Sequence, residues 1–258
     1  MFTIKLCFIS ILLLCISIVD LKAQEFIDPE ITCNETFIFD SALFFRKIQP
    51  DLPDIADSIR NADLFGPYFD QFPQIRSDII SALSYYPELA HLHLRFSYKP
   101  IRQTMNSRPS PINIFKKKAN RRYTIIVNNN TGKHKGLPFE KLSFNIKVGW
   151  LGHELAHTCE YETMNTGQTL IFSLKYIFSK KFVRKVERYT DFLTIKHGLA
   201  FPLYDGVDYL LESKDIDKKY REQSIFNSLS LEEIKCLWSK INTKNAVSTP
   251  GGSAKVNR

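Results

Sequence analysis

The stretch Gly152-His153-Glu154-Leu155-Ala156-His157 reads H-E-x-x-H, and it decides how the surrounding chain must fold. In an α-helix, residues four positions apart lie on one face, so His153 and His157 present their imidazoles side by side. Two imidazoles at this spacing are suited to bind one zinc ion, and Glu154 lies where it can take a proton from a bound water. The motif therefore predicts a helix with a metal-binding face.

The residues around this motif have the periodicity of an amphipathic helix. A core-facing stripe at helical spacing is formed by Phe144, Val148, Leu151 and Leu155. The two histidines then fall on another face, where a cleft can reach them. Gly149 and Gly152 are poor helix formers that cost about 1 kcal/mol each relative to alanine. Their presence predicts that another element packs closely against this helix.

A second predicted helix, Lys181–His197, supplies a candidate third ligand, and Gly198 follows it as a stop signal. Glu187 and Asp191 lie four positions apart, where two carboxylates repel each other on a solvated helix. Beside a divalent cation, Glu187 can bind the metal while Asp191 accepts the outer N–H of a ligating histidine and fixes its tautomer. The alternative is a solvated face on which three basic residues neutralise the acids: Arg184, Lys185 and Arg188. The H-E-x-x-H motif favours the ligand interpretation.

HELAH followed by E-x-x-x-D on a later helix resembles the gluzincin zinc metallopeptidases, and it is most similar to the prenyl-protein endopeptidase type and its soluble bacterial relatives. The similarity covers residues 123–199. It departs from the group at Thr190, where a small residue usually precedes the aspartate. The resemblance implies one zinc ion, Zn2+, with Glu154 as general base and acid. It also implies the zinc ligands and their supporting carboxylate, which are His153, His157 and Glu187 with Asp191.

The function implied by this resemblance is that of an exported zinc metalloendopeptidase, a hydrolase that cleaves peptide or protein substrates with a zinc-activated water. The oxyanion formed during hydrolysis needs a further donor, and the candidates are His197, Tyr204, Tyr209 and Tyr161. One alternative is a non-catalytic exported binding protein on a zincin scaffold, but the intact Glu154 favours the enzyme. A purely structural zinc site has four protein ligands, and the sequence offers no convincing fourth.

Residues 1–23 have the features of a secretory signal peptide. Lys5 precedes an apolar run at 6–19, and cleavage is expected after Ala23. The run is short for a membrane span, so the mature chain is expected to be secreted or periplasmic, without a spanning segment. The alternative is a membrane anchor formed by the uncleaved N-terminal segment.

The net charge of +8 is distributed in short basic clusters, at 116–118, 121–122 and 180–181. Aromatic residues and glycines do not alternate with these clusters as they do in RNA-binding strands, so no nucleic-acid partner is expected. Three cysteines follow the predicted cleavage site, Cys33, Cys159 and Cys236. They allow one disulfide and one free thiol, and the sequence does not choose the pair. Cys159 lies two residues after His157, which places it away from the histidine pair as an expected buried thiol.

Residues 24–243 are predicted to form one zincin-like domain of the α+β class, mostly helical, with a small sheet before the active-site helix. An N-terminal helical and β part (24–142) precedes the active-site helices (143–198) and the C-terminal helices (199–243). A disordered tail is expected at 244–258, where proline, glycine and serine concentrate.

Alternating polarity predicts strands at 91–98 and 122–128, and turn-forming residues predict loops at 99–120 and 133–142. Helical periodicity predicts helices within 37–86 and at 167–178, 208–223 and 230–241. His91 and His93 share one face of the first strand, which is interpreted as a polar sheet face rather than a metal site. The strand at 123–128 is expected near the cleft, since zincins often pair an extended substrate with an edge strand there.

Overall fold

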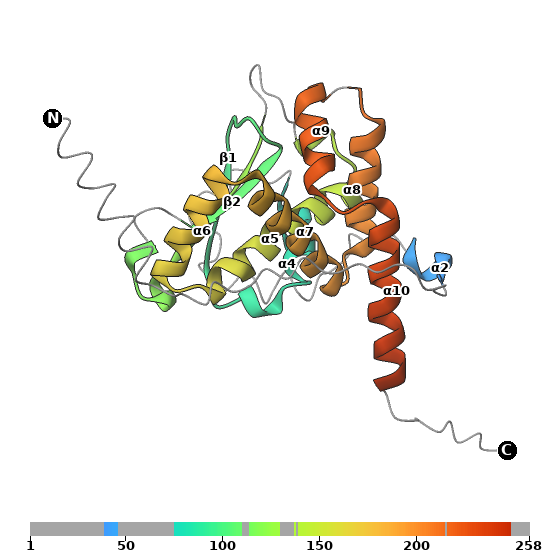
Figure 1. Ribbon diagram of the computed structural model, residues 1–258, viewed down its shortest axis with the longest axis horizontal. Coiled ribbons are helices and arrows are strands. Elements are labelled where there is room, and N and C mark those ends of the chain that lie inside the picture. Colours follow the sequence, from blue (N-terminus) through green and yellow to red (C-terminus); the bar gives the residue numbers. More distant parts are fainter. Residues whose placement is uncertain are drawn as a thin grey trace.

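Helix α5 (Phe144–Thr163), which carries the H-E-x-x-H motif, lies at the centre of the computed structural model (Figure 1). It starts where the Ser143 hydroxyl accepts a hydrogen bond from the Ile146 N–H at 3.3 Å, which satisfies one of the first-turn donors. The predicted stripe residues Val148, Leu151 and Leu155 are fully buried. The helix predicted from the spacing is therefore confirmed, and its neighbours surround it on several sides.

The structure describes residues 39–45, 75–109, 114–129, 137, 139–214 and 216–248. The predicted signal peptide (1–23) and Cys33 lie outside these residues. Within them, no helix is both long and apolar enough to cross a membrane. The described part is mostly helical with one small sheet, as the α+β prediction requires.

The sheet contains β1 (His93–Tyr98), β2 (Met105–Pro109) and β3 (Arg122–Val127), in the order β1-β3-β2. β1 runs parallel to β3, and β2 runs antiparallel to it. The prediction of a loop at 99–120 is wrong, because it contains β2. This segment has no alternating pattern of its own and is fixed by tertiary contacts: it pairs with β3 and packs against α5, where the Ser107 and Thr158 hydroxyls lie 3.1 Å apart.

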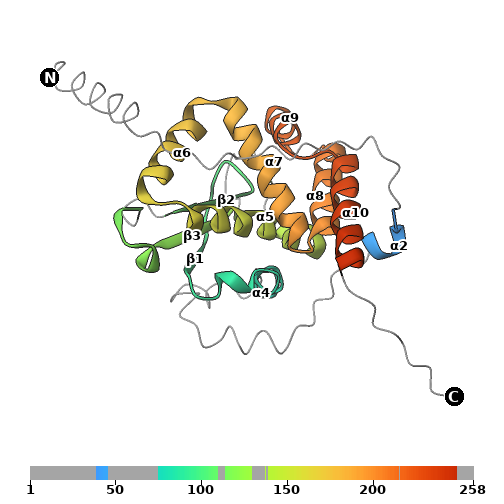
Figure 2. The same cartoon turned by 60° about the horizontal axis from the view of Figure 1, so that its bottom comes forward.

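Helices α6 (Thr166–Phe178) and α7 (Lys180–Lys196) follow α5, and Figure 2 shows them on the opposite side of α5 from α4 (Arg76–Leu83). α7 ends at Lys196, and Gly198 follows two residues later as the predicted stop signal, with a φ of 88° that favours glycine. The remaining short elements are α2 (Ser41–Phe44), η3 (Pro87–Leu89), η5 (Lys118–Asn120) and η6 (Phe139–Lys141).

Three helices complete the C-terminal part: α8 (Ala200–Glu212), α9 (Lys218–Asn227) and α10 (Leu231–Ser248). The single helix predicted at 208–223 is wrong, because the chain breaks after α8 and a new helix starts where Asp217 accepts from the Tyr220 N–H. The tail predicted from 244 begins too early, since α10 continues to Ser248. A capping box between Ser230 and Glu233 starts α10.

The close packing predicted at the α5 glycines is also present. A Cβ on Gly149 would lie 2.4 Å from the backbone oxygen of Pro202 in α8, and a Cβ on Gly152 would lie 2.3 Å from the Leu199 side chain. Backbone contact of this kind brings α8 directly against α5. Cys159, which faces away from the histidine pair as predicted, is a half-buried free thiol, while Cys236 is disulfide-bonded.

Candidate metal centre

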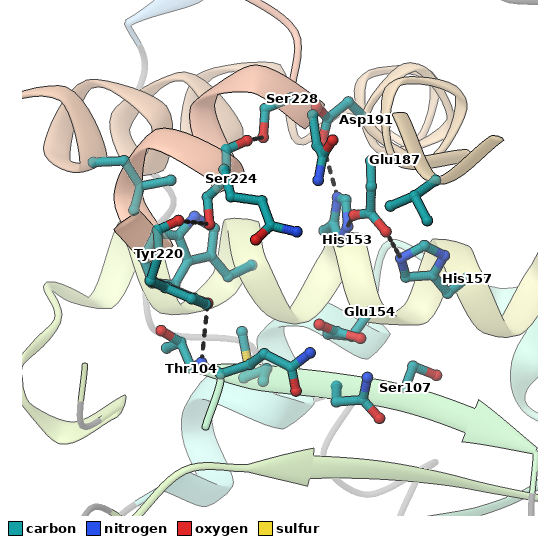
Figure 3. Close-up of a pocket in the computed structure, with 18 of the residues that line it drawn as sticks. Thr104, Ser107, His153, Glu154, His157, Glu187, Asp191, Tyr220, Ser224 and Ser228 are labelled. Atoms are coloured by element: carbon teal, nitrogen blue, oxygen red, sulfur yellow. Dashed lines mark hydrogen bonds and ion pairs between the residues drawn. The ribbon is translucent and has the colours of Figure 1, made fainter. Parts of the chain in front are cut away.

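The three predicted ligands converge from two helices. His153 and His157 extend from α5, and Glu187 reaches them from α7 (Figure 3). Glu187 Oε2 lies 3.1 Å from His153 Nε2, and its Oε1 lies 3.7 Å from His157 Nε2. The potential ligand atoms of the three residues all lie within 4.8 Å of one another. The i and i+4 spacing thus places two imidazole nitrogens and one carboxylate around a common point.

The outer nitrogen of His153 is held by Asp191, as the sequence predicts. His153 Nδ1 lies 2.8 Å from Asp191 Oδ1, so the ring donates there and leaves Nε2 directed at Glu187. The second carboxylate oxygen of Asp191 accepts the Leu229 N–H at 2.8 Å. Asp191 is almost fully buried. It therefore fixes both the ring orientation and the tautomer in which Nε2 is free to bind a cation.

The outer nitrogen of His157 is held by a residue that the sequence analysis missed. His157 Nδ1 lies 3.1 Å from Glu160 Oε2, and the Thr190 hydroxyl lies 3.1 Å from both of these atoms. Glu160 follows His157 by three positions on the same helix, and this spacing is the signal that could have identified it. The Thr190 hydroxyl thus contacts both His157 and the acid that holds it.

The charges of the cluster stabilise one another. Burial on its own raises the pKa of Glu187, but the two imidazoles outweigh this effect and hold that pKa well below its usual range. Burial lowers the pKa of His157, but Glu187 and Glu160 reverse this and raise it to about 10. Glu187 is therefore held in its ionised form, which is the form in which a carboxylate can bind a cation.

This donor set fits a divalent metal ion of the zinc class. Imidazole nitrogen and carboxylate oxygen are both zinc ligands, and three protein ligands leave a fourth tetrahedral position open. Each outer histidine nitrogen has a buried acidic partner, an arrangement that metal-ligating histidines commonly show. The residues that could hold the ion are His153, His157 and Glu187.

Glu154 lies on the side of α5 that faces β2, beside Ser107 (Figure 3). Burial raises the pKa of Glu154 above its ordinary value, while the two histidines and a backbone hydrogen bond with Ser107 oppose this rise. The side chain is close enough to the cluster for its charge to be felt by both histidines and by Glu187. A carboxylate with a raised pKa next to a metal-binding cluster can accept and return a proton.

The cluster and Glu154 open into a cavity of about 600 Å³. One wall is β2 and the segment before it, which contribute residues 102–107. Helix α9 forms another wall, and its Tyr220 hydroxyl accepts the Thr104 N–H at 3.2 Å, which joins α9 to the segment before β2. The strand at the cavity is therefore β2. The strand expected near the cleft, 123–128, is the central strand β3, and its neighbour β2 lies between it and the cavity.

Two tyrosines reach the cavity from the α5 and α6 side. Tyr161, one of the expected oxyanion donors, lines it, whereas Tyr204, Tyr209 and His197 are not among its lining residues. Tyr176 of α6, which the sequence analysis missed, also lines the cavity and donates its hydroxyl proton to Glu187 Oε1. No motif marks Tyr176, because its position depends on how α6 turns back over α5.

No family model matches the chain, and neither a curated protein nor a solved structure matches it. The resemblance to the gluzincins therefore rests on the sequence motif alone, that is on His153, Glu154, His157, Glu187 and Asp191.

Proposed function

We propose that the protein is a zinc-dependent metallopeptidase that hydrolyses peptide bonds, with the ion held by His153, His157 and Glu187. One observation carries the proposal: two Nε2 atoms and one carboxylate converge at the floor of a cavity, while buried acids hold both outer nitrogens. An ion-pair cluster that only stabilised the fold would not have to lie beside a large cavity. Glu154 in the same cavity supplies the base that hydrolysis requires.

The chemistry divides between the ion and the side chains. A zinc ion bound here supplies a Lewis acid that polarises the scissile carbonyl and lowers the pKa of a water molecule. Glu154 takes a proton from the attacking water and then transfers it to the leaving amine. The raised pKa of Glu154 suits both steps, because the group must hold the proton briefly and release it again. Tyr161, Tyr176 and Tyr220 are the tyrosines that line the cavity, and their hydroxyls are the candidate donors to the developing oxyanion. The Tyr176 hydroxyl would first have to leave Glu187, to which it donates.

The proposed substrate is a peptide or protein segment in an extended conformation. Among the described strands, β2 pairs only with β3, so its other edge faces the cavity. An edge strand can bind an extended chain through main-chain hydrogen bonds. A peptide bound at this edge would have its scissile carbonyl between β2 and α5, on the side where Glu154 lies.

The proposed location is outside the cytoplasm. Its basis is the signal-like segment at 1–23, and the disulfide-bonded state of Cys236 supports it, because disulfides persist in oxidising compartments. Processing of the segment is testable by N-terminal sequencing of the exported chain, where we expect Gln24 as the first residue. Recovery of the whole chain in the cytosolic fraction would contradict export.

The function is tested with the substitution Glu154→Gln, which keeps the size of the side chain and removes its basicity. We expect hydrolysis of casein or a quenched fluorogenic peptide library to fall by at least about 100-fold, because general base catalysis is worth this much or more. Zinc content should stay at the wild-type value, since Glu154 is not a ligand. The matched control is Glu222→Gln, an exposed glutamate on α9.

Three outcomes decide the proposal. Loss of activity with zinc retained supports it. Undiminished activity in the Glu154→Gln variant would overturn the assigned base. Absence of hydrolysis by the zinc-loaded wild-type chain over the whole library would favour a binding protein on the same scaffold.

A further inference from the structure

A second group of metal-ligand side chains lies outside the cavity. Glu88 of η3, Cys159 of α5 and His197 at the end of α7 offer a carboxylate oxygen, a thiol sulfur and an imidazole nitrogen that all lie within 4.8 Å of one another. None of the three lines the cavity of the candidate metal centre. The group is therefore separate from that centre, although both use α5 and α7.

The imidazole of His197 is held in the orientation that a metal ligand needs. Its Nδ1 lies 2.8 Å from the Leu193 backbone oxygen, so the ring donates there and Nε2 points to the other members of the group. The ring also stacks on Tyr86, with centroids 4.1 Å apart and an interplanar angle of 20°. A backbone carbonyl on the outer nitrogen is one of the usual partners of metal-ligating histidines.

The other two side chains meet at this nitrogen. Glu88 Oε1 lies 2.6 Å from His197 Nε2 and 3.6 Å from Cys159 Sγ. The Cys159 thiol donates a hydrogen bond to the same Glu88 oxygen that pairs with His197, so one carboxylate oxygen brings the sulfur and the imidazole nitrogen together. All three donors come from different segments of the chain, and the thiol belongs to the same helix as the two histidines of the first cluster.

We propose that Glu88, Cys159 and His197 form a second binding site for a divalent ion of the zinc class. A thiolate and an imidazole favour zinc and related transition metals over Ca²⁺ and Mg²⁺, which prefer oxygen ligands. Three protein ligands leave the fourth tetrahedral position to water, and the half-exposed group gives water access. On binding, the ion replaces the thiol proton, which passes to solvent.

The position of this site suggests a supporting role for the first. The ion would join η3 to α5 and to the C-terminal end of α7, the two helices that contribute His153, His157 and Glu187. Their relative position sets the distances within the first cluster. The proposal does not depend on peptidase activity, because metal binding by these residues is measurable in its own right.

Cobalt(II) tests the site directly, because a thiolate ligand gives a sulfur-to-cobalt charge-transfer band in the near ultraviolet. The first cluster contains no sulfur and cannot produce it. We expect the full chain titrated with cobalt to show the band, and the Glu187→Ala variant to keep it. Cys159→Ser, which preserves side-chain size, should abolish the band and remove one equivalent of bound metal.

The number of zinc ions bound per chain distinguishes the two sites. It is measured by elemental mass spectrometry after the zinc-loaded protein has been dialysed. We expect two equivalents in the wild type, one in Glu187→Ala and one in Cys159→Ser. His197→Ala should also bind one, while the matched variant His93→Ala, at an exposed histidine of β1, should bind two. Two results would overturn the second site and leave the proposed function intact. One is a Cys159→Ser variant that keeps the cobalt band. The other is a wild-type chain that binds a single zinc ion, which is lost in Glu187→Ala but kept in Cys159→Ser and His197→Ala.

Discussion

Each imidazole of the candidate metal centre is oriented by a different buried acid. Asp191 holds His153 from α7, and Glu160 holds His157 from within α5. Neither acid can be solvated in these positions, since both are nearly fully buried. The proposed metal-binding role would give both acids a function, because a fixed tautomer keeps each Nε2 available for a cation.

The contribution of Glu160 is testable with Glu160→Gln, which keeps the shape but weakens the bond to His157 Nδ1. We expect zinc affinity to fall by about 10- to 100-fold, the usual effect of removing an outer partner of a ligating histidine. Competition with a chromophoric chelator measures it. An affinity equal to that of the Glu222→Gln control would show that Glu160 has only a packing role.

The residues of the cluster could be predicted from the sequence, because each pair is marked by its spacing within one helix. The H-E-x-x-H spacing identifies His153 and His157, and the i and i+4 acids identify Glu187 and Asp191. The fold brings Glu187 to the two histidines and Asp191 to the outer nitrogen of His153. Tyr176 could not be identified in this way, since its contact with Glu187 exists only after α6 packs back on α5.

Helix contacts decide how accurately the ligands are placed. α5 and α8 approach each other at Gly149, where the Pro202 backbone of α8 contacts α5. Arg188 of α7 binds Glu233 of α10 through two hydrogen bonds of 3.0 and 2.7 Å. These contacts hold α7 against its neighbours. Gly149 could be anticipated as a packing position, whereas its partner α8 could not, because the sequence does not reveal which helix lies opposite.

The substitution Gly149→Ala tests the helix contact. A methyl group would overlap the Pro202 backbone, which cannot move aside as a flexible side chain can. We expect the free energy of unfolding to fall by about 1–3 kcal/mol despite the higher helix propensity of alanine. Urea denaturation measures the change. Gly167→Ala on α6 is the control, because its Cβ meets nothing closer than 3.5 Å and should not destabilise the protein. Equal stability of both variants would contradict close packing.

The Arg188–Glu233 pair gives the fold a defined pH dependence. Burial on its own raises the pKa of Glu233, but the hydrogen bonds from Arg188 and the Ser230 N–H outweigh it and hold that pKa below its ordinary value. A lowered pKa in the folded state stabilises the protein above the unfolded pKa of about 4.3. This stabilisation is lost as the pH falls through the folded pKa.

Glu233→Gln isolates the charge, since glutamine can still complete the capping box. We expect the variant to be less stable than the wild type by about 1 kcal/mol at pH 7, with the difference vanishing in acid. Thermal unfolding between pH 7 and pH 3 measures both profiles. Parallel profiles over that range would exclude a contribution from this carboxylate.

At the scale of the molecule, the cavity lies where the sheet, α5, α7 and α9 meet. The α+β class and the order of the main helices could be predicted, because hydrophobic periodicity is carried by each segment. The strand at Met105–Pro109 could not be predicted, because its pairing with β3 fixes it. The break between α8 and α9 could not be predicted either, because the contact of α9 with the segment before β2 fixes it. The sequence therefore predicted the side chains of the cluster, but it did not predict two elements that line the cavity, β2 and α9.

Metal removal should weaken the whole fold. A ligand that binds only the folded chain stabilises it by about 2.7 kcal/mol at a free concentration 100 times its dissociation constant. We expect EDTA to lower the thermal midpoint of the zinc-loaded wild type and to leave that of a Glu187→Ala/Cys159→Ser double variant unchanged. Calorimetry measures both. An unaltered wild-type midpoint would mean that zinc does not bind the folded chain.

The central claim concerns the position of one ion, and anomalous diffraction at the zinc edge from crystals of the zinc-loaded protein tests it most directly. We expect a peak between His153 Nε2, His157 Nε2 and the Glu187 carboxylate, at about 2 Å from each ligand atom. A zinc-loaded crystal with no anomalous peak in contact with these three residues would contradict the account.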